Sequence, residues 1–116
     1  MSEADGLLVA CLCAEWCGTC RDYAEPFAAL ARRGGTRCVW VDIEDHEEVL
    51  DEVDVDNFPT LLIARGDTVL FFGTVTPHAR TLERLVEAAA RGELKALDDA
   101  RLAGLPARVR AIEPAG

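Results

Sequence analysis

Two cysteines three positions apart, Cys17 and Cys20, are the residues of this sequence best suited to do chemistry. They follow an apolar run, Leu7 to Cys13, that is typical of a buried strand, and they precede a stretch with apolar residues at helical spacing. At such a junction, thiols at positions i and i+3 lie on one face of the first helical turn and can reach disulfide distance with little strain. The unpaired N–H groups and the macrodipole of the helix N-terminus favour the thiolate of Cys17. We therefore expect Cys17 to be the nucleophile and Cys20 to act second, on the mixed disulfide that Cys17 forms with a substrate.

Three further cysteines lie nearby, at positions 11, 13 and 38. The spacing C-x-C-x3-C-x2-C from Cys11 to Cys20 offers four thiolates, which in principle can hold zinc or an iron–sulfur cluster. Cys11 and Cys13 belong to the predicted buried strand, however, where cysteine often behaves as a small hydrophobe, and a closed tetrahedral site would require the junction to be remodelled. We predict a structural role for these two thiols and no metal or other cofactor, and we leave an auxiliary redox role open.

The elements that must position the cysteines follow from periodicity. The apolar positions between Gly18 and about Arg33 predict a helix with Pro26 inside it. "RCVWVDIED" predicts a strand with Val39, Val41 and Ile43 on one face and Cys38, Trp40 and Asp42 on the other. A short acidic helix is expected from Asp45 to Val53. "NFPTLLIA" and "TVLFFG" predict antiparallel strands joined at "RGD". Thr76 as N-cap and Pro77 as first residue predict a last helix, closed by Gly92.

The signal weakens after Gly92. Leu94, Leu97, Leu102 and Leu105 are spaced for a short helix, whereas the final "EPAG" indicates a fraying end. We therefore divide the chain into a domain at residues 1–92 and a C-terminal extension at residues 93–116, a short helix with a mobile tail.

Composition narrows the class of partner. The 116 residues carry a net charge of -9, so a nucleic acid or an anionic membrane would be repelled, and the apolar run from Leu7 to Ala14 is too short to span a bilayer. The acidic run from Asp42 to Asp56 is interpreted as a solvated face, because its spacing matches no oxygen-ligand loop.

Glu3 and Asp5 stand where a secretory signal would be basic, and five crowded cysteines do not resemble a secreted disulfide scaffold. We expect a cytoplasmic monomer.

The segments "AEWCGTC", "VDIED" and "NFPTLLI" together resemble the thioredoxin family over about Gly6 to Gly92. The resemblance implies an α/β, thioredoxin-like three-layer sandwich with a four-stranded mixed sheet in the order βαβαββα, lacking the first strand and helix of the family. It also implies a thiol–disulfide oxidoreductase active in electron transport, with protein disulfides as substrates. A surface for these substrates would be formed by Trp16, Gly18, Thr19, Phe58, cis-Pro59, Phe72, Gly73 and Thr74.

The sequence departs from the family pattern at positions that matter for catalysis. Thr19 stands where many members have proline, and Pro26 lies one position after the usual helix proline. Cys11 replaces the buried aspartate beneath the second cysteine, and Trp40 replaces the lysine that partners this aspartate. The usual proton relay is therefore missing.

Our interpretation is a disulfide reductase recycled by an external electron donor, either a flavin-dependent thioredoxin reductase or a glutathione system. The alternative is a non-enzymatic binding or redox-sensing module that uses the same fold and the surface of Trp16, Phe58 and Phe72 to hold a specific partner protein.

Overall fold

The computed structural model describes residues 7–14, 18–33, 36–46, 49, 59–75 and 78–112. In these ranges the elements are β1 (Leu7–Cys13), α1 (Gly18–Arg33), β2 (Arg37–Asp42), β3 (Thr60–Arg65), β4 (Thr68–Thr74), α3 (Ala79–Ala90), a 3-10 helix η2 (Ala100–Leu102) and α4 (Leu105–Arg110). The four described strands form one sheet in the order β2-β1-β3-β4. β1 pairs in parallel with β2 and antiparallel with β3, and β4 runs antiparallel to β3, which confirms the mixed sheet.

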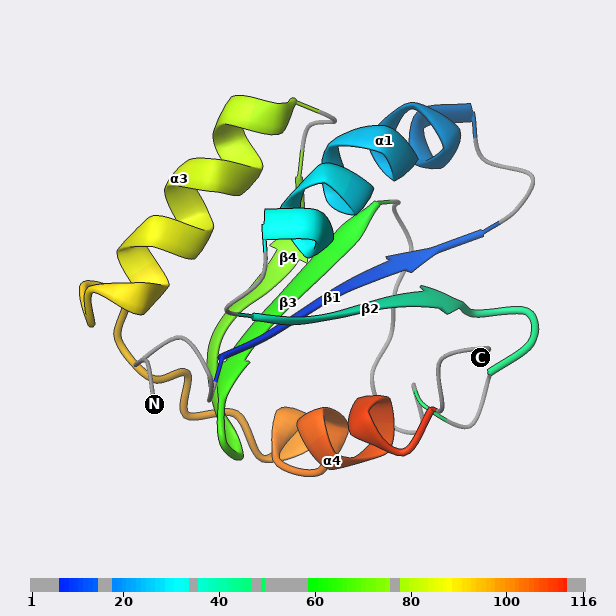
Figure 1. The fold of residues 1–116 in the computed structure, drawn as a ribbon. Helices are drawn as coiled ribbons and strands as arrows, with labels where there is room; N and C mark the ends of the chain where they lie inside the picture. Colours follow the sequence, from blue (N-terminus) through cyan, green and yellow to red (C-terminus); the bar gives the residue numbers. More distant parts are fainter. Residues whose placement is uncertain are drawn as a thin grey trace.

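β1 lies at the centre of the molecule and is buried along its whole length. Because side chains alternate along a strand, its odd-numbered residues, from Leu7 to Cys13, pack in a core with α1 and α3. Its even-numbered residues, Leu8 to Leu12, pack in a second core with α4. Figure 1 shows α1 and α3 above the sheet and α4 below it, so the fold is a three-layer α/β sandwich.

α1 has the bounds predicted from the sequence. Its buried residues, Cys20, Tyr23, Phe27 and Leu30, recur every three or four positions and form a single stripe toward the sheet. Arg32 and Arg33 in its last turn carry positive charge where the helix dipole is negative. The stripe therefore fixes the rotation of the helix and directs Cys20 into the core.

Three sequence predictions about local structure need correction. Arg65 pairs with Thr68, so the turn between β3 and β4 is only Gly66 and Asp67, and the φ of +61° at Gly66 explains the glycine. α3 begins at Ala79 with His78 at its N-cap; the predicted cap and first residue at positions 76 and 77 lie outside the described residues. Asp45 lies in a turn and does not begin a helix.

The C-terminal segment packs against the sheet through residues that the leucine spacing only partly identified. Leu97 is exposed, whereas Leu102, Leu105 and Val109 are buried in the second core. The helix predicted across Leu94 to Leu105 is wrong in position, because the α-helix begins at Leu105 and continues to Arg110. Proline is the second residue of this helix, where its missing N–H needs no partner.

Candidate active site at the β1–α1 junction

Cys20 is held at the junction by the packing of α1 on β1. Gly18 and Thr19, the first two residues of α1, are exposed, whereas Cys20 is only 2% exposed and belongs to the first core. Trp16, Cys17 and Phe58 lie outside the described residues. Of the predicted cysteine pair, the structure therefore places the second member, which is buried in the same core as Cys11 and Cys13.

Cys11 and Cys13 lie on the face of β1 that α1 covers. Their sulfur atoms are 3.2 Å apart, within the distance of a thiol–thiol hydrogen bond, and the two residues are 0% and 1% exposed. Cys11 thus places a thiol at a fully buried position of the sheet. The prediction that both residues are buried on a strand is confirmed.

Tyr23 lies one turn after Cys20 on the same helix face and is fully buried. Its hydroxyl group has no hydrogen-bond partner among the residues that the structure describes. Burial raises the pKa of this phenol, and negative charge on Cys11 or Cys13 raises it further. The phenol is therefore held in its neutral form in the core.

A pocket of about 230 Å³ lies beside Cys20, between the end of β1, the first turns of α1 and the end of β2. Asp42 and Arg21 bring opposite charges to its wall, and Asp42 Oδ1 accepts a hydrogen bond of 2.9 Å from the backbone N–H of Glu44. The ring of Trp40 packs edge-on against Phe27, with centroids 5.7 Å apart. The pocket is lined by Cys13, Ala14, Cys20, Arg21, Ala24, Trp40 and Asp42.

The role of Asp42 in this pocket was missed by the sequence analysis. The alternation of β2 already placed Asp42 on the same face as Trp40 and Cys38, and Cys38 does pack against the first core. The register of β1 and β2, which pairs Cys13 with Asp42, brings this carboxylate to the end of the strand that carries the cysteines. This register cannot be derived from the sequence of either strand alone.

The structure describes only some residues of the predicted substrate surface. Pro59 is buried, and its carbonyl oxygen accepts a hydrogen bond of 3.1 Å from the N–H of Val75, just after β4. The pairing of Thr60 with Thr74 and of Leu61 with Gly73 places Gly73 and Thr74 beside Pro59. Phe72, by contrast, packs partly against the second core.

Cys38 stands apart from this group. It is half-buried on β2, its sulfur lies 3.4 Å from the hydroxyl group of Thr36, and burial raises the pKa of its thiol. In the part of the chain that the structure describes, no three Cys, His, Asp or Glu side chains gather closely enough to hold a metal ion. The fourth thiol of the possible metal quartet, Cys17, is not among those residues.

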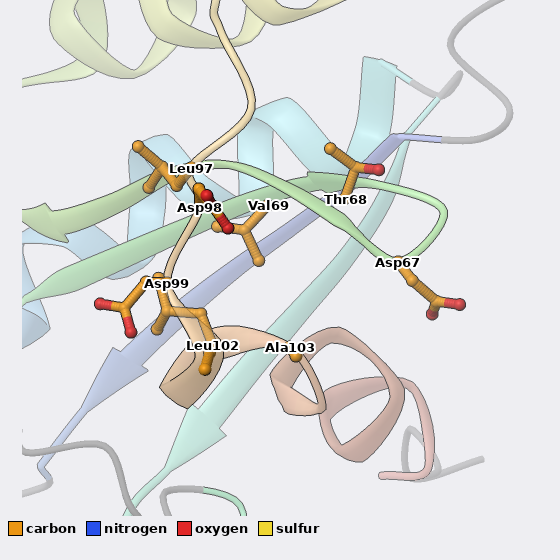
Figure 2. Close-up of a pocket in the computed structure, with 9 residues that line it drawn as sticks. Asp67, Thr68, Val69, Leu97, Asp98, Asp99, Leu102 and Ala103 are labelled. Atoms are coloured by element: carbon orange, nitrogen blue, oxygen red, sulfur yellow. The ribbon is translucent and has the colours of Figure 1, made fainter.

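A second pocket of about 290 Å³ lies between the β3–β4 turn and the segment that leads into α4 (Figure 2). Asp67, Asp98 and Asp99 are on its wall. Asp99 is engaged with Arg101, whose backbone and side-chain nitrogens donate to it, and these hydrogen bonds lower the pKa of its carboxyl group. This pocket contains none of the cysteines.

The arrangement of sheet and helices is that of thioredoxins. A solved structure of a mutant thioredoxin from Halobacterium salinarum superposes with a TM-score of 0.65 at 19% identity, over 74% of this chain and 76% of that one. The structure of Fasciola hepatica thioredoxin superposes with a TM-score of 0.65 at 25% identity, over 73% of this chain and 83% of that one. The protein therefore has a thioredoxin-like fold.

Comparison of the amino-acid sequence with known proteins identifies the family as well as the fold. The thioredoxin family model matches residues 1–91, and Thioredoxin-1 of Drosophila yakuba is 32% identical over 89 residues, which are 72% of this chain and 83% of the relative. The chain belongs to the thioredoxin family. Membership of this family suggests thiol–disulfide oxidoreductase chemistry. No helix in the described ranges combines the length and apolar character needed to cross a membrane.

Proposed function

We propose that this protein reduces protein disulfides, with Cys17 as the nucleophile and Cys20 as the resolving thiol. The observation that carries the proposal is the burial of Cys20 in the first turn of α1, in a chain that the thioredoxin family matches from residue 1 to 91. A buried thiol is protected from reagents in solution and reacts with a disulfide held on a neighbouring cysteine. This is the property that a resolving cysteine requires.

The chemistry is two successive thiol–disulfide exchanges. The thiolate of Cys17 attacks one sulfur of the substrate disulfide, whose S–S bond breaks and releases the first substrate thiolate. Cys20 then gives up its proton and attacks Sγ of Cys17, which releases the second substrate thiolate and leaves a disulfide between the two cysteines. A flavin-dependent thioredoxin reductase or a glutathione system returns the two electrons.

The proton of Cys20 needs an acceptor, since Cys11 offers no carboxylate beneath it. Asp42 lines the same pocket as Cys20, and the pocket has room for water between the two groups. We assign Asp42 as this acceptor, through water, and its half-buried position keeps the carboxylate in contact with solvent. The assignment would make β2 part of the catalytic machinery.

Substrate binding is assigned to the edge at which β3 begins and β4 ends. The hydrogen bond between Pro59 and Val75 and the pairing of Thr60 with Thr74 support a rigid backbone at this edge. We include the remaining predicted surface residues in the proposal: Trp16, Gly18, Thr19, Phe58, Phe72 and Gly73. The odd number of cysteines and their crowding in the first part of the chain support a reducing, cytoplasmic location without a structural disulfide. We include a monomeric state in the proposal.

The test is reduction of a protein disulfide such as that of insulin, with dithiothreitol as electron source. Replacing Cys17 or Cys20 by serine is expected to abolish the activity, because attack and resolution each need their own thiol. Cys38→Ser is the matched control and is expected to retain it. Undiminished activity in Cys17→Ser would show that the cysteine pair is not the catalyst and would favour the binding module.

A further inference from the structure

Arg108 brings a guanidinium group into the contact between α4 and the segment that follows β2. Its Nε–H donates a hydrogen bond of 2.7 Å to the carbonyl oxygen of Val49, a residue that is 1% exposed and packs in the second core. Nη2 of the same group is buried and has no hydrogen-bond partner among the described residues. Taking a charged group out of water costs free energy unless its donors are satisfied. Packing alone therefore does not account for an arginine at this position.

Space for the guanidinium group depends on Gly104, the N-cap residue of α4. A Cβ atom at this position would lie 2.7 Å from Nη1 of Arg108, which is closer than such atoms approach one another in proteins. The end of an arginine side chain can normally move away, but here the hydrogen bond from Nε to Val49 holds it. The glycine thus leaves room for a guanidinium group that is fixed in one place.

Hydrogen bonds continue from Val49 to the carboxylate that we assigned as proton acceptor. The N–H of Val49 donates to the carbonyl oxygen of His46 at 3.0 Å, and the N–H of His46 donates to the carbonyl oxygen of Asp42 at 3.0 Å. The N–H of Glu44 donates to Oδ1 of Asp42 at 2.9 Å. The segment that Arg108 holds at Val49 is therefore the one that orients the Asp42 carboxylate.

The two ends of this segment belong to opposite sides of the sheet. Asp42 lines the pocket with Cys20, which is part of the first core, whereas Val49 packs in the second core with α4. Figure 1 shows α1 and α4 on opposite faces of the sheet. The hydrogen bonds from Arg108 to Asp42 thus connect the C-terminal helix with a pocket on the other face.

We propose that Arg108 is a positioning residue for the reductase reaction, which holds the segment after β2 so that the Asp42 carboxylate stays directed to the pocket beside Cys20. The proposal rests on the reductase function and on the assignment of Asp42 made above. A base acts within hydrogen-bond reach of its proton or through one water molecule, so the rate depends on where the base lies. A displacement of about 1 Å can cost about 100-fold in rate.

The experiment measures the decay of the mixed disulfide between Cys17 and a substrate peptide, by acid quenching, in variants that circular dichroism shows to be folded. Arg108→Met keeps most of the side-chain volume and removes the bond to Val49, and it is expected to slow the decay by about three- to tenfold. Gly104→Ala keeps the arginine but displaces its guanidinium group, so a similar slowing is expected. Arg108→Lys keeps a charged donor and is expected to stay within about twofold of wild type.

Arg110→Met is the matched control. Arg110 lies in the same helix, but its Nη1 is 3.8 Å from Oδ1 of Asp67 in the β3–β4 turn, so the decay rate is expected to equal that of wild type. Exchange of the Val49 amide hydrogen with solvent, measured by NMR, should be at least about fivefold faster in Arg108→Met than in this control, because Val49 loses its anchor.

Repeating the comparison in the Asp42→Asn background separates positioning from a general structural role. There Arg108→Met should cause no further slowing, because the carboxylate that it positions is gone. Further slowing of the same size in this background, or a wild-type rate in Arg108→Met alone, would overturn the inference and leave the reductase function intact. No reduction of insulin by wild type would overturn the reductase function itself.

Discussion

Leu105 offers a direct test of whether the C-terminal segment is part of the folded core. Its side chain is 0% exposed and packs in the second core with Leu102 and Val109, on the face of β1 that carries Leu8 and Leu12. Leu105→Ala removes buried methyl groups and leaves a cavity between α4 and the sheet. We expect the free energy of unfolding to fall by about 2–5 kcal/mol. For a domain with a total stability of about 5–15 kcal/mol, this is a large fraction.

The assay is urea unfolding followed by circular dichroism and by tryptophan fluorescence, with a matched leucine as control. Leu97 precedes α4 by a few residues and is 43% exposed, so Leu97→Ala is expected to change the free energy by less than about 0.5 kcal/mol. At roughly 4 °C per kcal/mol, Leu105→Ala should also lower the melting temperature by about 8–20 °C. If the two variants unfold at the same urea concentration, α4 does not contribute to the core and the packing described for it is wrong.

Three further predictions concern the active-site region. Tyr23 is the only tyrosine, and because its pKa is raised in the folded state above the ordinary 10.0, its contribution to folding stability should be constant below about pH 10 and be lost progressively above it. Tyrosinate absorbance should appear only as the protein unfolds, and Tyr23→Phe should reduce the loss of stability at alkaline pH but keep the part that comes from the raised pKa of Cys38. Asp42→Asn should slow the decay of the mixed disulfide between Cys17 and substrate by roughly tenfold or more, as followed by acid quenching. Glu44→Gln, a change outside the pocket, is the control, and equal decay rates in the two variants would exclude Asp42 as proton acceptor. Because Thr19 does not rigidify the motif and Cys11 carries no buried charge, we expect a reduction potential of Cys17 and Cys20 near the glutaredoxin range of about -200 to -230 mV, above the approximately -270 mV of thioredoxin. Titration against glutathione measures this potential, and a value below that of thioredoxin would contradict the reasoning.

The elements that the sequence predicted well are those whose signals are local. The bounds of α1 follow from its apolar stripe, and the two faces of β2 follow from alternation, with Val39 and Val41 in the second core and Cys38 against the first. The two-residue turn at Gly66 and the start of α3 at Ala79 differ from prediction, because the ends of these elements depend on register and on chain direction. These differences at the ends of elements do not change the fold and do not move the described cysteines.

The pocket beside Cys20 illustrates a different limit. Its composition depends on which residue of β2 lies next to which residue of β1, and the pairing of Cys13 with Asp42 is set by the whole sheet. Neither segment contains that information alone. The replacement of the expected aspartate by Cys11 was visible in the sequence, but the carboxylate that could take over its role becomes apparent only when the strands are paired.

The position of α4, in contrast, has a cause that the sequence already contains. All seven residues of β1 are apolar and buried, so the sheet needs cover on both faces, and α1 and α3 supply it on one face only. A face left bare would expose Leu8 and Leu12 to water at roughly 25 cal/mol for each Å². The chain after Gly92 carries Leu102, Leu105 and Val109, which bury themselves on that face. The apolar second face of β1 therefore predicts that the C-terminal segment packs on the sheet, although the helical signal of that segment is weak.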